Sequence, residues 1–243
     1  KGNNGDYIHY TLHPTPYILD IRYIYQTSKG PAAARNKGMD LAKGEIIGFV
    51  DDDCVLDKEW IDKAVLAHRE NPKAVAVGGD TFSFSSRLTA MVSQFLSTCS
   101  IETDIDGRRE IIFFPTCNVS FKKAMLDDYK FNEEFPLPGG EDLEYFWRLF
   151  KSGRKFVWDK SIKVIHYRDD ALMSFIRQAY IYGRGNLLVQ YIHNDHPLLK
   201  ELKTGRVSFW AATLTNIVKI PRFSYLLGKR FIKENNVENI YRK

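Results

Sequence analysis

The chain has 243 residues, of which 44% are hydrophobic and 27% charged. These proportions are ordinary for a soluble globular protein, and the length suits one large α/β domain or one domain with an appendage. No apolar run approaches the roughly 20 residues that a transmembrane helix needs. The formal net charge of +5 is uneven, because residues 200–243 carry ten Lys or Arg against three Asp or Glu. The acidic main part argues against a nucleic-acid groove, and the basic tail allows contact with an anionic membrane surface.

The periodicity of apolar residues predicts an alternation of strands and helices along the first half. We expect strands at residues 17–25, 46–50, 74–77 and 111–114, and helices at residues 31–44, 58–69, 86–98 and 121–128. The helix from Pro31 has proline at its first position and Gly44 at its end, as helix starts and stops often do. The strand, helix and strand within residues 17–50 predict a parallel β–α–β unit, with residues 46–50 as a buried strand.

In the second half we expect a helix at residues 141–151, strands at 155–158 and 162–167, and helical structure from residue 170. A boundary near residues 168–171 would divide a catalytic domain, residues 1–168, from a helical, basic and aromatic extension, residues 169–243. In that extension, residues 207–220 combine an apolar face with basic flanks. This pattern favours an amphipathic helix on a membrane, and the alternative is packing against the core or a partner chain.

Three successive carboxylates, Asp51, Asp52 and Asp53, follow the apolar run at residues 46–50. Open α/β sheets bind ligands just beyond the carboxyl ends of their strands. Adjacent acids repel one another unless a cation or hydrogen-bond donors neutralise them, and hard oxygen ligands suit Mg²⁺ or Mn²⁺. The segment therefore predicts a metal–phosphate site, although a solvated acidic turn before the next helix would have the same composition.

Three other groups of residues are candidates for the same chemistry. Glu141 and Asp142 follow two glycines and open a helix, so they are a possible general base or merely acids favoured by the helix dipole. His166 ends an apolar strand, where it would be a structural residue or a nitrogen ligand for the metal. Arg35 lies in an alanine-rich helix and would pair with phosphate or with the acids, or would simply be exposed.

The order of these motifs resembles the family-2 inverting glycosyltransferases of GT-A fold. The matching segments, in chain order, are KGPAAARNKG, FVDDD, PTCNVSFKK, GGEDLEYFWRLFKSG and KVIHYR. The resemblance covers about residues 28–168. It implies an α/β fold of GT-A (Rossmann-like) type, with a mixed sheet flanked by helices and a C-terminal helical extension.

The resemblance also implies roles for individual residues. Asp51 or Asp52 would touch the nucleoside of a nucleotide-diphosphate sugar donor, and Asp53 would coordinate the Mn²⁺ or Mg²⁺ that bridges its diphosphate. Asp142 would be the catalytic base, with Glu141 beside it as a second catalytic residue near the acceptor or donor sugar. The other implied contacts are His166 to the metal, Asn118 to the donor sugar and Arg35 to the donor.

The implied reaction is inverting transfer of a sugar to a carbohydrate or lipid-linked acceptor. The basic segment at residues 203–233 would allow a cytoplasmic enzyme to attach peripherally to the inner face of the cell membrane. Nothing before Tyr17 matches the first nucleotide-binding segment usual in the family, so that segment is expected to be missing from this sequence. A non-catalytic scaffold domain is therefore one alternative. A phosphohydrolase is another, but Cys54 and its neighbours replace the Gly-Thr pair that such sites need. The three cysteines lack metal-ligand spacing, and reduced thiols are expected.

Overall fold

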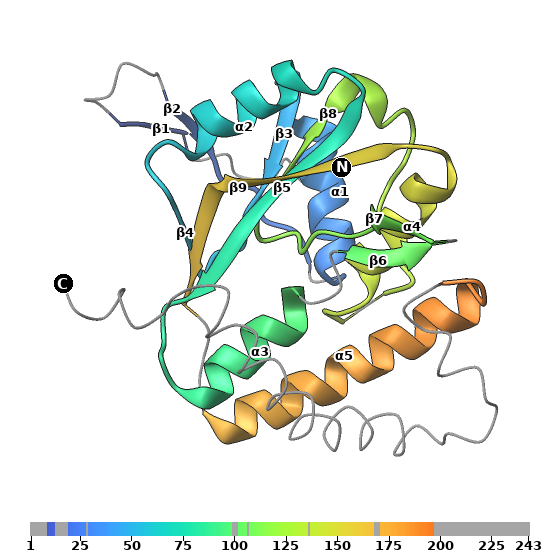
Figure 1. Cartoon of the computed structure of the whole chain (residues 1–243). Coiled ribbons are helices and arrows are strands. Elements are labelled where there is room, and N and C mark those ends of the chain that lie inside the picture. The colour runs from blue at the N-terminus through green and yellow to red at the C-terminus, as the bar shows by residue number, and fades with distance from the viewer. Residues whose placement is uncertain are drawn as a thin grey trace, which may run out of the picture.

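The computed structural model describes residues 9–12, 19–27, 29–98, 102–105, 107–135, 137–167 and 171–196. Its centre is a five-stranded sheet with strand order β3-β8-β5-β9-β4 (Figure 1). The strands are β3 (Ile46–Phe49), β4 (Cys54–Leu56), β5 (Ala74–Ser83), β8 (Val119–Lys122) and β9 (Lys155–His166). The aspartates therefore follow a strand at one edge of this sheet.

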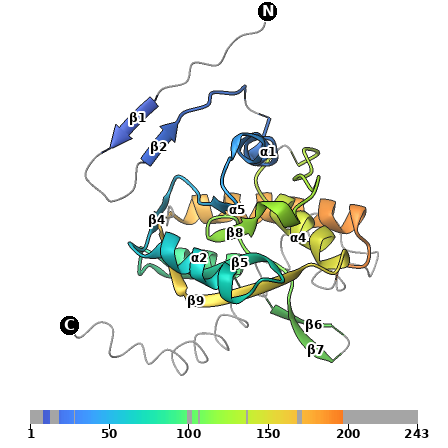
Figure 2. The same ribbon diagram turned by 90° about the horizontal axis from the view of Figure 1, so that it is seen from above.

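The sheet is mixed rather than parallel. Only β5 and β9 run parallel, while β3 pairs with β8, β8 with β5 and β4 with β9 in antiparallel fashion. The predicted parallel β–α–β unit within residues 17–50 is wrong, because β2 (Leu19–Arg22) pairs with β1 (His9–Leu12) in a separate hairpin. Figure 2 shows that hairpin standing apart from the sheet, on the same side of it as α1. The apolar run before the aspartates reflects an edge strand that is only partly buried.

The helices cover both faces of the sheet. They are α1 (Pro31–Leu41), α2 (Trp60–Glu70), α3 (Leu88–Thr98), α4 (Glu141–Lys151) and α5 (Leu172–Ile192). On one face, Trp60, Ala64 and Ala67 of α2 pack against buried residues of β5 and β9. On the other face, α4 brings Tyr145 and Phe146 into the main apolar core with residues of β5 and β8. This arrangement confirms the predicted helices at residues 31–44, 58–69, 86–98 and 141–151.

Three predicted elements are wrong or misplaced. Residues 121–128 are not a helix: β8 ends at Lys122 and only a 3-10 turn, η1 (Lys123–Met125), follows. The strand expected at 111–114 lies earlier, as β7 (Arg108–Ile111), which pairs with β6 (Glu102–Ile105) in a hairpin. The two strands expected within residues 155–167 are one continuous strand, β9. Strands β8 and β9 pair with strands that are distant in the chain, so there the pairing outweighs local propensity, whereas β7 is fixed by a local hairpin with β6.

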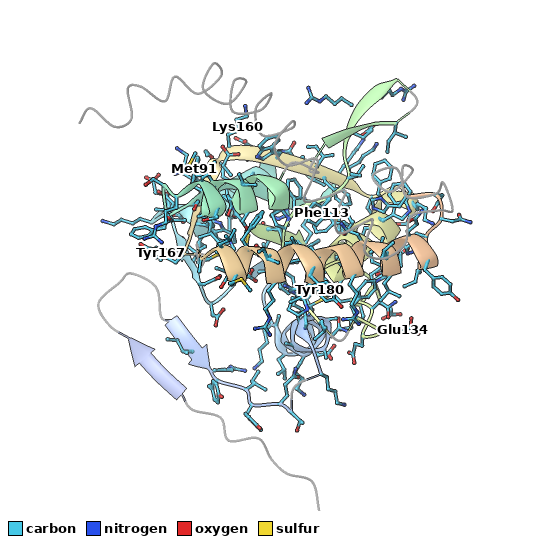
Figure 3. All side chains as sticks on the ribbon, turned by 90° about the horizontal axis from the view of Figure 1, so that it is seen from below. Met91, Phe113, Glu134, Lys160, Tyr167 and Tyr180 are labelled. Atoms are coloured by element: carbon cyan, nitrogen blue, oxygen red, sulfur yellow. The ribbon has the colours of Figure 1, made fainter. Side chains whose placement is uncertain are left out.

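The start of α4 lies against the middle of α5, and glycine makes this contact possible. Gly139 and Gly140 have positive φ angles of 105° and 94°, a region that favours glycine. A Cβ atom on Gly185 of α5 would lie 1.9 Å from the carbonyl oxygen of Gly139. Gly185 lies within one unbroken helix, α5, and touches the turn that precedes Glu141 and Asp142. In Figure 3, α5 crosses the face in view beside α3, with Tyr180 labelled.

We expect Gly185→Ala to lower the free energy of unfolding by about 1–3 kcal/mol, because the new methyl group has no space against Gly139. Gly38→Ala is the matched control, since a Cβ atom there has nothing within 4 Å and lies inside α1. The control should be neutral or stabilising by up to about 1 kcal/mol. Urea unfolding followed by circular dichroism measures both, and equal stability of the two variants would contradict the close contact.

Within the described residues, no helix is both long enough and apolar enough to cross a membrane. The amphipathic helix predicted at residues 207–220 and the basic segment at 203–233 lie outside the described residues. The proposed division at residues 168–171 stays a prediction.

Candidate active site

Asp51, Asp52 and Asp53 form a tight turn, called here the aspartate turn, between β3 and β4. The amide of Cys54 donates to the carbonyl oxygen of Asp51 at 3.2 Å, which closes the turn. The amide of Tyr167 donates to the carbonyl oxygen of Asp53 at 2.7 Å and ties the turn to the end of β9. The side chains of Asp51 and Asp53 are 39% and 46% exposed. The turn thus presents carboxylates to solvent from a backbone held on both sides.

His166, the last residue of β9, lies beside these carboxylates. Its Nε2 is 3.0 Å from Oδ2 of Asp53, and its side chain is only 6% exposed. Ligand atoms of Asp51, Asp53 and His166 all lie within 4.8 Å of one another. Two carboxylates and an imidazole are a suitable donor set for Mn²⁺ or Mg²⁺ with part of the coordination shell left open. The residues present therefore fit the metal that the sequence predicts.

Arg35 of α1 connects the aspartate turn with the start of α4. Its guanidinium donates to Oε1 of Glu141 at 2.6 Å and lies 3.8 Å from Oδ1 of Asp51. Burial acts to lower the pKa of Arg35, but Glu141, Asp142 and Asp51 outweigh it and raise that pKa. The arginine is therefore a permanent cation placed among acids from two distant segments, and the prediction that it pairs with the acids is confirmed.

Glu141 is the most enclosed acid of this group, with a side chain that is 4% exposed. Its second carboxylate oxygen accepts the amide hydrogen of Gly139 at 2.7 Å. Both oxygens are thus occupied, one by Arg35 and one by the backbone of the turn. Through these two bonds, Glu141 holds Arg35 and the glycine turn in position.

Asp142 is half-buried beside Glu141, and its Oδ1 accepts the amide hydrogen of Leu143 at 2.9 Å. Burial raises the pKa of Asp142 to about 7, and the negative charge of Glu141 adds to the rise, while Arg35 opposes it. A carboxyl group that titrates near neutral pH is suited to accept a proton during a reaction. Burial likewise raises the pKa of Asp51, with Arg35 acting against it.

A cleft of about 490 Å³ opens next to the aspartate turn. One side is α1, which presents mainly small residues and Arg35, and the other is β3 with the first two aspartates of the turn. Its lining residues are Pro31, Ala34, Arg35, Gly38, Ala42, Ile47, Gly48, Phe49, Val50, Asp51, Asp52 and Thr116. The cleft is large enough for part of a nucleotide.

Asn118 precedes β8 and is fully buried. Its Oδ1 accepts the indole hydrogen of Trp60 at 2.8 Å, and its amide donates to the carbonyl oxygens of Asp80 at 2.9 Å and Ile162 at 3.4 Å. These bonds join α2 to β5 and β9 at the residue that precedes β8. The predicted contact of Asn118 with a donor sugar stays a prediction, and the bonds give the residue a positioning role.

We expect Asn118→Ala to lower the free energy of unfolding by about 2–3 kcal/mol, because it leaves several buried polar groups without a partner. The matched control is Asn71→Ala, whose side chain makes one bond, to the carbonyl oxygen of Ala67 at the end of α2. That change should cost about 1 kcal/mol. Thermal unfolding of both variants checks the difference, and an Asn118 variant as stable as the native chain would show that the bonds are dispensable.

The structure brings two cysteines and a histidine together in a cluster that the spacing of cysteines along the chain did not predict. Cys54 lies directly opposite His166 in the pairing of β4 with β9. The sulfur atoms of Cys54 and Cys117 and a ring nitrogen of His166 all lie within 4.8 Å of one another. In the sequence, one cysteine directly follows the acids and another directly precedes Asn118. These positions indicate a cluster only once the pairing of the strands is known.

The mixed sheet, the acidic strand end and the facing acid-bearing helix define a domain of the GT-A fold class. Residues 10–130 match the sequence profile of Glycosyl transferase family 2. The chain carries a domain of that family.

Several characterised proteins resemble the chain over most of its length. A pre-mycofactocin glycosyltransferase of Mycobacterium tuberculosis is 24% identical over 201 residues, covering 79% of this chain and 42% of the relative. A hyaluronan synthase of Pasteurella multocida is 28% identical over 184 residues, covering 61% of this chain and 19% of the synthase. The chain thus spans well under half the length of these relatives.

A relative of more similar length is the GalNAc(5)-diNAcBac-PP-undecaprenol beta-1,3-glucosyltransferase of Campylobacter jejuni. It is 23% identical over 221 residues, covering 88% of this chain and 66% of the relative. Among solved structures, the mannosyltransferase PcManGT from Pyrobaculum calidifontis, in complex with GDP-Man and Mn²⁺, has a TM-score of 0.50 and 15% identity. The match covers 88% of this chain and 61% of that one, and it supports the fold.

Proposed function

We propose that the chain transfers a sugar from a nucleotide-diphosphate donor to an acceptor hydroxyl, with a divalent metal and with inversion at the anomeric carbon. The observation that carries this proposal is the charge cluster that links the two ends of the site. Arg35 contacts Glu141 and lies near Asp51, so it holds the aspartate turn close to the acid pair that opens α4. A candidate metal-binding group and a candidate base would thereby act at one site.

The nucleoside of the donor would occupy the cleft between α1 and β3. Small residues on α1 leave space for a flat ring, and Asp51 and Asp52 line the same cleft, where they would contact the nucleoside and ribose. Asp53 and His166 would hold the Mn²⁺ or Mg²⁺, with Asp51 close enough to contribute. When bound, the metal would supply the Lewis acidity that neutralises negative charge on the departing diphosphate.

Asp142 would take the proton of the acceptor hydroxyl as the new glycosidic bond forms. Its pKa of about 7 makes it a stronger base than an ordinary carboxylate, while much of it is still deprotonated at neutral pH. Glu141 would not touch the acceptor but would fix Arg35 and the turn, since both of its oxygens are bonded. Direct displacement with one base opposite the leaving group inverts the anomeric centre.

The acceptor is a carbohydrate or a lipid-linked carbohydrate. The name of the Campylobacter jejuni relative, which includes an undecaprenol-linked acceptor, supports the lipid-linked class. Enzymes that act on such acceptors work beside a membrane, and the basic segment at residues 203–233 would provide peripheral attachment to anionic lipid.

Calorimetric titration with nucleoside diphosphates tests the proposal without knowledge of the sugar. UDP, GDP, CDP, ADP and TDP are added to the purified chain with Mn²⁺ and again with a chelator. We expect one or two of them to bind only with Mn²⁺, and the Asp53→Asn variant to lose this binding. Asp57→Asn, a change to an exposed acid outside the cluster, should keep it. Metal-independent binding, or none with any diphosphate, would favour the scaffold alternative.

A further inference from the structure

Cys54, Cys117 and His166 meet directly behind the aspartate turn, although they come from three separate parts of the chain. Cys54 begins β4, Cys117 precedes β8 and His166 ends β9. Their two sulfur atoms and one ring nitrogen lie within 4.8 Å of one another. Both cysteines are free thiols, with Cys54 half-buried and Cys117 buried. The sugar-transfer mechanism uses neither of them.

Two thiols and an imidazole are the donor set of a zinc-class ion rather than of Mn²⁺ or Mg²⁺. Thiolate and imidazole are soft to borderline ligands and select Zn²⁺, whereas carboxylates suit the harder ions. At a Zn–S distance of about 2.3 Å, the ligand atoms of a tetrahedral site lie roughly 3.5–4 Å apart. The distances between the two sulfur atoms and the ring nitrogen would therefore need to shorten by about 1 Å for all three to bind one ion.

Asp53 is placed to complete a fourth position. Its Oδ1 lies 3.8 Å from Sγ of Cys54, and its Oδ2 lies 3.0 Å from Nε2 of His166. The hydroxyl of Thr81 lies 3.9 Å from Sγ of Cys117, behind the cluster, where it can support that sulfur as an outer partner. Four ligand groups and one supporting group thus surround the same small volume.

We propose that Cys54, Cys117, His166 and Asp53 form a binding site for Zn²⁺ or a chemically similar ion, distinct from the oxygen-rich site of Asp51, Asp53 and His166. The two sites share His166 and Asp53, so they cannot be filled independently. A zinc ion on the sulfur side withdraws both shared groups from the oxygen side. Zinc therefore opposes the binding of Mn²⁺. Through Cys54 and Cys117, metal binding by the domain depends on the relative concentrations of Zn²⁺ and Mn²⁺.

Titration of the reduced 243-residue chain with Co²⁺ tests the sulfur site, because bound Co²⁺ reports thiolate ligands by a charge-transfer absorption band. We expect this band to saturate at one equivalent and to disappear when Zn²⁺ is added. Cys54→Ser and Cys117→Ser should each abolish the band and weaken zinc binding by more than the roughly tenfold to hundredfold caused by loss of an outer partner. Cys99→Ser is the matched control and should keep the band, as should Asp51→Asn, which removes a ligand of the oxygen site and none of the four proposed zinc ligands.

Alkylation of the unmutated chain gives a second measurement that does not depend on how a variant folds. Iodoacetamide is added with and without Zn²⁺, and the modified cysteines are identified by mass spectrometry. We expect Zn²⁺ to protect Cys54 at least tenfold while Mn²⁺ protects it little. The proposal is overturned if Co²⁺ gives no thiolate band, if the band survives both serine variants, or if Zn²⁺ leaves alkylation of Cys54 unchanged. None of these results bears on whether nucleoside diphosphates bind with Mn²⁺.

Discussion

Replacing Asp142 with asparagine is expected to lower the rate of sugar transfer by about 10²–10⁴-fold while donor binding stays near native. Asparagine keeps the shape of the side chain and can still accept the amide hydrogen of Leu143, but it cannot take a proton. Glu134→Gln, a change to an exposed acid in the segment before the glycines, is the matched control and should leave the rate unchanged. Steady-state rates and donor titrations measure both quantities, and native turnover in Asp142→Asn would remove the residue from the mechanism.

The raised pKa of Asp142 leads to a prediction for the pH dependence of the reaction. Burial and the neighbouring Glu141 raise the pKa of Asp142 from its ordinary value of 3.8 to about 7. Because a base acts in its deprotonated form, the rate should fall about tenfold per pH unit below about pH 7 and level off above it. A rate profile that stays flat from pH 5 to pH 8 would contradict this assignment.

The raised pKa also has a consequence for stability, which the asparagine variant makes visible. The folded chain binds the proton of Asp142 more tightly than the unfolded chain does, so the cost of burying the charge grows from about pH 4 and is complete above about pH 7. Asp142→Asn should therefore be more stable than the native chain at pH 8 and about equally stable at pH 4. A buried ionisable group that lowers stability is typical of a functional site, as proposed for Asp142.

The second large effect concerns Arg35. Arg35→Met is expected to lower the free energy of unfolding by about 3–5 kcal/mol, because it leaves the buried carboxylate of Glu141 without its cation. Urea unfolding at pH 7 measures the change. Lys63→Met is the control, since Lys63 pairs with Asp57 and Glu59 at the surface, and its loss should leave stability near native.

A double variant separates the ion pair from the packing of the arginine side chain. Adding Glu141→Gln to Arg35→Met removes the uncompensated charge, so it should restore part of the lost stability. If the double variant is less stable than Arg35→Met alone, the interaction between the two residues is not the source of the effect.

Local sequence predicted the helices of this fold better than its sheet. The helix at residues 141–151 was predicted with its observed bounds, because its apolar spacing and its first-turn acids both lie within one element. The strand at residues 119–122 was missed, because it is stabilised by β3 on one side and β5 on the other. Residues 123–128 resemble the start of a helix when read without those neighbours.

The candidate site shows the same division. The carboxylates of residues 51–53 and 141–142 were recognisable from their positions after a strand and before a helix. The contact of Arg35 with Glu141 joins residues 106 positions apart, so no local pattern specifies it. The approach of Cys117 to Cys54 and His166 likewise depends on the packing of three strands.

The central claim is that the aspartate turn and His166 hold a divalent metal together with a nucleoside diphosphate. Electron paramagnetic resonance of Mn²⁺ tests it directly, because free Mn²⁺ gives a sharp spectrum that is lost on binding. We expect the nucleoside diphosphate that binds in calorimetry to tighten Mn²⁺ binding, and Asp53→Asn to weaken it by about tenfold or more. Mn²⁺ binding that is the same in Asp53→Asn and in the native chain, with or without the diphosphate, would contradict the account.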